Sequence, residues 1–365
     1  MTRTREMPPV GGVTLYNPAK VQKGYTLFSP LEMKKVWLID MRGRFAHHWE
    51  MPYVPGLHGE FLPNGNLLYA GRDPKSPLAQ LFGCGGVLME VDWDGNLVWK
   101  YEDPYLHHTF CRMANGNTMV LKWVEVPKDM AAKVKGGIPG TELDGVMWTD
   151  SFQEITPSGK VIWEWKAYEH LDPEKDVFCP LCARNEWTSA NALKVLPNGD
   201  ILTSFRRTNT VAIIDKQSGN IKWKWGYGIV AHQHDPTLLE NGNILLFDNG
   251  FHPYGLTQGI SQVLEVNPDT SEIVWSYRDD PTGDIYCPKM GSCQRLDYAN
   301  TMICLGDWGR IFEIKKNGEV IWDYESPFFY DHPVLGYTNM VFSARRYGYD
   351  YEGFQGKQME SLNSL

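Results

Sequence analysis

The sequence lacks any apolar run long enough to cross a bilayer, and it has no excess of basic residues. A transmembrane helix needs about 20 consecutive apolar residues, and no stretch of the chain supplies them. The 35 Lys and Arg are outnumbered by 44 Asp and Glu, so no basic stripe offers itself to nucleic acid. The first residues, Met1 to Glu6, lack the apolar stretch of a signal peptide. These absences predict a cytoplasmic protein with no membrane or nucleic-acid partner.

Cysteine is sparse and odd in number, since the chain has 7, which excludes a complete disulfide framework. Cys179 and Cys182 form a CxxC motif that could be redox-active or half of a zinc site. No second CxxC follows and no βαβ pattern surrounds the motif. The simplest interpretation is therefore two thiols in a long surface loop, and we assign no chemistry to the other cysteines.

The chain does contain a repeated phrase, a Gly followed four residues later by Trp. Its copies lie at 95–99, 159–163, 219–223 and 318–322, with a looser copy at 271–275. A second phrase, an Asn-Gly turn, recurs at 64–65, 115–116, 198–199 and 241–242. Short strands and Gly/Asn turns repeating at a period of about 40–50 residues are typical of a β-propeller. Five of the 14 Trp close a repeat, where a large apolar wedge can pack on the neighbouring blade.

The phrases divide the chain into six repeats, so we predict an all-β, six-bladed propeller that forms a single domain over residues 1–365. The predicted blades are 36–71, 87–121, 151–204, 211–247, 262–304 and 311–343. Strands within residues 13–28 could close the ring by joining the last blade. Two stretches, 123–150 and 168–186, do not fit the period and are expected to be insertions over the funnel.

The register of the repeats brings polar residues together. Counting seven back from the Asn of each turn gives His108, Asn191 and His234. Equal register in equivalent blades implies that these side chains face one another across the axial funnel. Four residues lie close to these positions: His58, one residue out of register, the neighbours His107 and His232, and Arg206, which ends a strand.

Clustered histidines beside an arginine suit the transfer of a tetrahedral oxyanion. A guanidinium grips two oxygens in a fork, and a neutral imidazole nitrogen can attack sulfur or phosphorus. The remaining histidines are expected on the surface or in packing, although His252 lies close enough to line the same rim; the others are His47, His48, His170 and His332.

Three segments of the chain resemble the bacterial aryl-sulfate sulfotransferases (arylsulfotransferases) that do not use a nucleotide sulfate donor. The segments are 107–120, 187–206 and 233–250. In that family a propeller transfers a sulfuryl group from one phenol to another through a transiently sulfated histidine. The resemblance implies that His234 is the nucleophile and that His108 and Arg206 contact the sulfuryl group. It also implies that Asn191 is a supporting polar contact, that the substrates are an aryl sulfate and a phenol, and that no cofactor is needed.

One position departs from the family's pattern. The third residue of the family's Trp-Thr-His-x-Asn segment is a histidine, and here it is Ser189. Serine supplies a hydroxyl but does not titrate near neutral pH. We therefore expect Ser189 to line the substrate site with His58, His107, Asn191 and His232, and expect His232 or His58 to replace the missing imidazole.

Two alternatives remain open from the sequence. The four residues His58, His108, His232 and His234 could ligate one zinc or iron ion, and such a site could run lyase, hydratase or oxygenase chemistry on an aromatic substrate. A propeller that docks other proteins on its faces is less well supported, because the polar cluster lies inside the funnel. Assembly into a homo-oligomer is compatible with either alternative.

Overall fold

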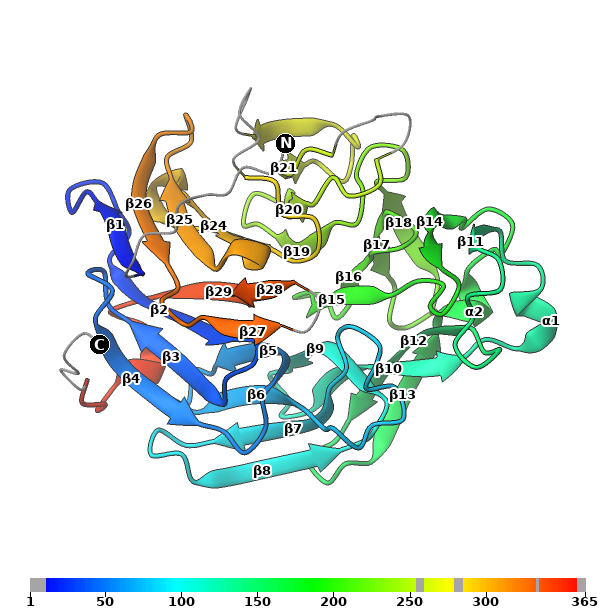
Figure 1. Ribbon diagram of the computed structural model, residues 1–365, viewed down its shortest axis with the longest axis horizontal. Coiled ribbons are helices and arrows are strands. Elements are labelled where there is room, and N and C mark those ends of the chain that lie inside the picture. Colours follow the sequence, from blue (N-terminus) through cyan, green and yellow to red (C-terminus); the bar gives the residue numbers. More distant parts are fainter. Residues whose placement is uncertain (1–10, 254–258, 279–284, 333–334, 360–365) are drawn as a thin grey trace.

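The computed structural model describes residues 11–253, 259–278, 285–332 and 335–359. The protein is an all-β, six-bladed propeller, with its sheets set around a central axis (Figure 1). We name the blades A to F in chain order. Blade A contains β29 (Val341–Gly348), β2 (Gly24–Pro30), β3 (Lys35–Ile39) and β4 (Phe45–Glu50). Blade B contains β5 (Pro55–Phe61), β6 (Leu67–Arg72), β7 (Gly86–Val91) and β8 (Leu97–Glu102). Blade C contains β9 (Leu106–Arg112), β10 (Thr118–Glu125), β12 (Trp148–Ile155) and β13 (Val161–Lys166).

The remaining three blades follow the same order of strands from the axis outward. Blade D contains β15 (Ala190–Val195), β16 (Ile201–Phe205), β17 (Thr210–Ile214) and β18 (Ile221–Trp225). Blade E contains β19 (His234–Leu238), β20 (Ile244–Asp248), β21 (Gln262–Val266) and β22 (Ile273–Tyr277). Blade F contains β23 (Ser292–Arg295), β24 (Thr301–Leu305), β25 (Arg310–Ile314), β26 (Val320–Glu325) and β1 (Gly12–Tyr16). The innermost strands contact one another in the order β5, β9, β15, β19, β23 and β29.

The predicted blade boundaries are wrong by half a blade. Each predicted segment joins the two outer strands of one sheet to the two inner strands of the next; 36–71, for example, spans β3 and β4 of blade A and β5 and β6 of blade B. The reason is that both repeated phrases are turns, one within a sheet and one near its outer edge. Such turns reveal the length of the repeat, but they do not reveal which strand is the first of each sheet.

The ring closes through strands from the two ends of the chain. β2 pairs antiparallel with β29, so that Gly24 lies opposite Gly348. β1 pairs with β26 as a fifth, outermost strand of blade F. Both strands expected within residues 13–28 therefore pair with C-terminal strands, but they join two different blades.

The repeated Asn-Gly turns have a structural role between strands. Gly116 has a φ of 84° and Gly242 a φ of 82°, values that favour glycine. The asparagines after these glycines donate to a glutamate of the third strand: Asn117 to Glu154 at 2.5 Å and Asn243 to Glu265 at 2.7 Å. These amides satisfy partly buried carboxylates, which explains why the phrase recurs.

Four of the five repeated tryptophans connect their blade to the next, whereas the indole N–H of Trp223 has no partner among the described residues. The indole N–H of Trp99 donates to the carbonyl of Pro157 at 2.7 Å, and that of Trp163 to Lys216 at 3.1 Å. Trp275 and Trp322 make the same bond to Lys316 and Met41. Each acceptor lies in an outer turn of the following blade, so the tryptophan is both an apolar wedge and a hydrogen-bonded link.

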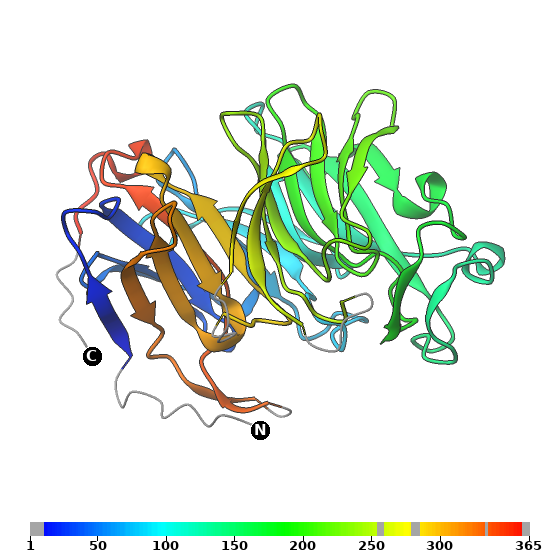
Figure 2. The same ribbon diagram turned by 90° about the horizontal axis from the view of Figure 1, so that it is seen from above.

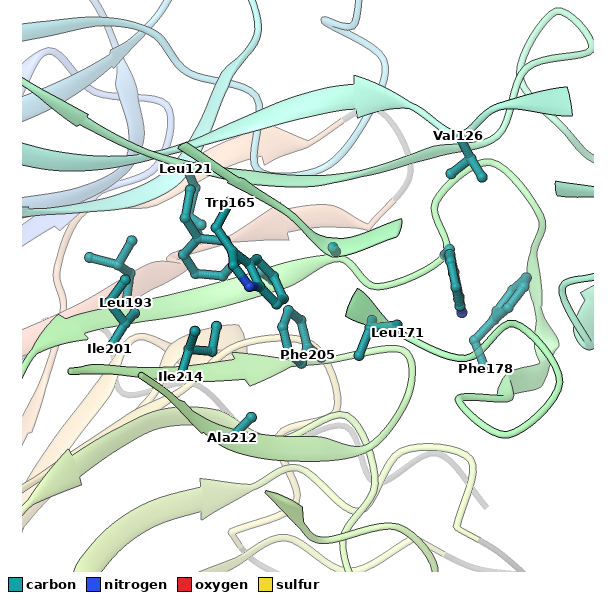
Figure 3. Close-up of a cluster of buried hydrophobic side chains, with 14 of the residues drawn as sticks. Leu121, Val126, Trp165, Leu171, Phe178, Leu193, Ile201, Phe205, Ala212 and Ile214 are labelled. Atoms are coloured by element: carbon teal, nitrogen blue, oxygen red, sulfur yellow. The ribbon is translucent and has the colours of Figure 1, made fainter. Parts of the chain in front are cut away.

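Two insertions interrupt the blade pattern and pack against each other. The first carries α1 (Lys128–Ala131) and β11 (Gly136–Ile138), and the second carries α2 (Ala167–His170) and β14 (Phe178–Ala183). β11 and β14 form a parallel pair, at the opposite end of the molecule from β1 (Figure 2). Their side chains Leu171 and Phe178 belong to the same buried cluster as Trp165 and Phe205 of blades C and D (Figure 3).

The other elements are short. They are the hairpin β27 (Tyr330–His332) and β28 (Gly336–Thr338) and the 3₁₀ turns Asp297–Ala299, Gly306–Trp308 and Glu352–Phe354. Over the residues described, the chain contains no helix that is long and apolar enough to cross a membrane.

Candidate functional site

A cavity on the propeller axis gathers side chains from the inner strand, or the residues just before it, in every blade. We call it the axial cavity. Its polar lining includes His58 of β5, Asn191 of β15, His234 of β19 and Arg345 of β29. Blade C contributes Thr109 rather than His108. Asn191, His234 and His58 thus line one cavity; His108 and Arg206 are not among its lining residues, although both lie close enough to His234 for their charges to affect one another.

The tautomer of His234 follows from its hydrogen bond to Asn249. The Asn249 amide nitrogen donates to the carbonyls of Cys287 at 2.7 Å and Met290 at 2.9 Å, which fixes the orientation of the amide. Its oxygen then faces His234 Nδ1 at 2.6 Å. Because a carbonyl oxygen only accepts, His234 must carry its proton on Nδ1. Nε2 is left with a lone pair, as a nucleophile requires.

The ring of His234 is neutral because its surroundings disfavour the imidazolium. The side chain is 1% exposed. Burial, with a smaller effect of the neighbouring Arg206 charge, lowers the pKa of His234 to about 3.

Arg206 is the cationic side chain near His234 that is best suited to bind an anion. It follows β16 directly, and its backbone N–H donates to the carbonyl of Ser189 at 3.3 Å. Its neighbour Arg207 is held by Ala183, Asn185 and Glu186. Within the described part of the chain the Arg206 guanidinium has no hydrogen-bond or ion-pair partner. Its fork of donors is thus available to a bound oxyanion.

His108 is connected to a buried carboxylate through His107. The Nδ1 atoms of the two rings lie 2.9 Å apart, and His107 Nε2 lies 3.3 Å from Asp150 Oδ1. One of the two Nδ1 atoms must donate to the other, whereas His107 Nε2 and Asp150 Oδ1 have no hydrogen-bond partner among the described residues.

His108 has a left-handed backbone conformation and is closely packed. Its φ is 51°, at an irregularity in the pairing of β9 with β10, and its ring packs against Gly83, where a Cβ would meet it at 2.2 Å. Burial lowers the pKa of His108 well below its usual value, with smaller effects of His107, His234 and Arg206.

Asn191 connects blade D to the residue just before blade E, and Ser189 lies two residues before Asn191. Ser189 is buried with a φ of 51°, the same backbone conformation as His108. The Asn191 amide donates to the Gln233 carbonyl at 2.8 Å, while its Oδ1 is buried without a partner in the described structure. An unpaired oxygen facing the axial cavity can accept a hydrogen bond from a bound hydroxyl.

His58 is the third imidazole near His234 with a free nitrogen. Its Nε2 is buried and has no partner among the described residues, and its ring packs on Phe110 with 4.9 Å between centroids. Burial lowers the pKa of His58 well below its usual value, assisted by Lys194 and Arg345.

The four histidines considered as metal ligands do not converge on one point. Among the described residues, the group of His, Cys, Asp and Glu side chains that could hold a metal ion is Cys179, Cys182, His232 and His252. Only His232 belongs to both sets. His232 turns toward Cys182, with its Nε2 3.6 Å from Sγ.

Two features of this region could not be predicted from the sequence. Asn249 lies in the Asp248-Asn249-Gly250 stretch, but nothing in the pattern shows that its amide meets His234. The CxxC motif and His252 each gave a local signal, yet only the fold brings β14 against the rim of blade E.

Asp235, next to His234, does not assist that ring. It pairs with Arg345 and accepts from the Cys293 N–H at 2.9 Å.

Several solved structures resemble this chain at low sequence identity. A protein of unknown function from Bacteroides caccae has a TM-score of 0.56 at 12% identity, covering 88% of this chain and 98% of that one. A streptogramin B lyase gives 0.48 at 10% identity, covering 88% and 85%. A catalytically inactive virginiamycin B lyase from Staphylococcus aureus gives 0.47 at 10% identity, covering 86% and 88%. At 12% identity the first shows a shared fold alone.

No curated protein sequence matches the chain. The model of the arylsulfotransferase (ASST) family, in contrast, matches residues 58–327. That range begins at His58 and includes His108, Arg206 and His234. It covers most of the chain, and the protein therefore belongs to the arylsulfotransferase family.

Proposed function

We propose that the protein transfers a sulfuryl group from an aryl sulfate to a phenolic acceptor through a sulfohistidine at His234. Family membership supports a transferase of the aryl-sulfotransferase type. The observation that carries the finer proposal is the His234–Asn249 hydrogen bond of 2.6 Å, because it leaves the lone pair on Nε2 of a neutral, buried imidazole.

In the first half-reaction, His234 Nε2 attacks the sulfur of the donor. The Nε2–S bond forms while the S–O bond to the aryl group breaks, and the electron pair leaves on the phenolate oxygen. The Arg206 guanidinium holds the sulfuryl oxygens, as its lack of a protein partner permits. Asn249 accepts from Nδ1–H throughout, and so stabilises the positive charge that the sulfated ring acquires.

In the second half-reaction, the acceptor phenol attacks the same sulfur. Its oxygen forms the new S–O bond, the phenol proton passes to a base, and the S–Nε2 bond electrons return to His234. Neither step requires a nucleotide or a metal ion. Phe342 lines the axial cavity and lies edge-on to His234 with 6.0 Å between centroids, so it offers an apolar surface to the aryl ring.

We assign the proton transfers to His58, which takes the place of the family histidine replaced by Ser189. His58 lines the same cavity as His234, and its Nε2 is unpaired within the described structure. His232 is less suited, because its Nε2 faces Cys182. The phenolate of the first half-reaction leaves as the anion and takes its proton from solvent, and neutral His58 then accepts the proton of the incoming phenol and releases it to solvent.

The test is the intact mass of the protein after incubation with a chromogenic aryl sulfate. We expect a gain of one sulfuryl group that maps to His234, is absent in His234→Ala and is discharged by added phenol. His170→Gln, which changes a histidine stacked on Trp165 away from the cavity, should label like the wild type. Phenol release without an adduct, or an adduct that persists in His234→Ala, would contradict the proposal.

A further inference from the structure

The second insertion brings two cysteines against two histidines of blade E. Cys179 and Cys182 lie on β14, His232 lies just before β19, and His252 follows β20. The Cys179 Sγ is 3.3 Å from His252 Nδ1, and the Cys182 Sγ is 3.6 Å from His232 Nε2 and 3.8 Å from His252 Nδ1. Each of the four side chains offers one ligand atom, and all four atoms lie within 4.8 Å of one another.

These distances match the edges of a tetrahedral zinc site. With Zn–S bonds of about 2.3 Å and Zn–N bonds of about 2.0–2.1 Å, a tetrahedron has S···N edges of roughly 3.5 Å. The three measured S···N distances lie on either side of this value. Two thiolates and two imidazoles in tetrahedral array are a set that favours zinc over the harder divalent ions.

The surroundings suit a closed structural site. Cys179 is 2% exposed and His232 is fully buried, whereas Cys182 and His252 are partly exposed and leave a path for the ion. The His252 ring is fixed by stacking on Phe251 with 3.8 Å between centroids. Two thiolates balance the charge of the ion, so the site would be neutral beside Arg206.

We propose that Cys179, Cys182, His232 and His252 bind one zinc ion as a structural site. With four protein ligands the ion has no open position, so it takes no part in chemistry. It ties β14 of the insertion to the rim of the propeller, two residues from His234 and beside Arg206. This inference does not depend on sulfuryl transfer.

The decisive experiment measures metal binding by the whole chain, independent of activity. The protein is purified under reducing conditions without an affinity tag that binds metals, and its zinc content is measured by mass spectrometry. Metal is then removed with a chelator, and the chain is titrated with Co²⁺, whose thiolate charge-transfer bands and intense visible bands report tetrahedral sulfur ligation. The variants are Cys182→Ser and His252→Gln, with Cys111→Ser as the control at a partly buried cysteine outside the cluster.

We expect about one zinc per chain, tetrahedral cobalt bands in the wild type and in Cys111→Ser, and at least tenfold weaker binding in the other two variants. A reduced wild type that binds neither ion would overturn the proposal, as would undiminished binding by Cys182→Ser. A Cys179–Cys182 disulfide present in the freshly isolated protein, with no zinc bound after its reduction, would establish a redox pair instead. Should the variants fail to fold, the cobalt spectrum of the wild type decides the question, because bands without thiolate charge transfer rule out this ligand set.

Discussion

His234 and Asn249 are joined by a 2.6 Å hydrogen bond in which the direction of the proton is fixed by a third partner, the backbone of residues 287 and 290. The amide cannot turn over without losing both of its own donations. The side chain of Asn249 thus determines which nitrogen of His234 is free, although Asn249 does not itself line the axial cavity.

Replacing Asn249 should therefore slow the transfer without weakening substrate binding. In Asn249→Ala the His234 ring can adopt either tautomer and loses its orientation, and we expect kcat to fall by about 10–100-fold while KM changes little. Steady-state kinetics with a chromogenic aryl sulfate measures both constants. Asn243→Ala removes a comparable amide on the far side of blade E, where it bonds to Glu265, and should keep its kcat. A change confined to KM in Asn249→Ala would refute the positioning role.

We expect Arg206 to act through the planar pair of N–H donors of its guanidinium as well as through its charge. Arg206→Ala is expected to lower kcat/KM by about 10²–10³-fold, the usual cost of removing a donor from a developing oxyanion. Arg206→Lys keeps the charge but lacks the planar pair of donors, and should recover only part of the loss. Arg295→Lys, on an arginine paired with Glu265, is the matched control. Full activity of Arg206→Lys would show that charge alone suffices.

Asp150 should contribute to stability more than a typical surface carboxylate does. Its Oδ2 accepts from the Ala190 N–H at 2.8 Å and its Oδ1 faces His107, so it links blades C and D. Asp150→Ala leaves a buried N–H unpaired, and we expect the free energy of unfolding to fall by about 2–4 kcal/mol in urea titrations. Asp94→Ala, at an exposed position, should change it by less than about 0.5 kcal/mol. Equal effects of the two variants would contradict this role.

His47 should make the fold sensitive to acid. Its Nε2 donates to the Trp93 carbonyl at 3.0 Å, its ring stacks on that indole, and burial lowers the pKa of His47 to about 4. In the unfolded chain the pKa is about 6.5, so between these values the unfolded state binds a proton that the folded state does not. The stability contributed by His47 is complete above about pH 6.5 and is lost as the pH falls toward 4.

The measurement is the free energy of unfolding across that pH range for the wild type and His47→Gln. Glutamine can still donate to the Trp93 carbonyl but does not titrate. We expect the variant to show a shallower loss of stability, by about 1–2 kcal/mol over the range after allowance for solvent screening. Parallel pH profiles would show that another group titrates there.

The fold could be predicted because its signals are local and repeated. An Asn-Gly turn and a tryptophan recur where each blade needs them, and turn chemistry survives without knowledge of the partner strand. The blade boundaries could not be predicted, since the choice of first strand depends on β2 pairing with β29, more than 300 residues away.

The candidate site was predictable where it followed the register and not where the backbone departs from it. Asn191, His234 and, one residue off, His58 meet in the axial cavity as the spacing indicates. His108 is not among the residues that line it. The contact of Asn249 with His234 and the contact of β14 with blade E both join segments that are far apart in the sequence. No residue spacing predicts such contacts.

The closure of the ring has a consequence for synthesis. β29, which supplies Arg345 to the axial cavity, is made after every other blade strand, and β2, its partner, is made before all of them but β1. In blade A, β2, β3 and β4 therefore lack their innermost neighbour until all the other blades have been made. During that interval the edge of β2 is open to pairing with other chains. The addition of β29 closes the ring and completes the cavity wall in a single late event. A nascent chain that stalls before residue 341 therefore has neither a closed ring nor a complete cavity.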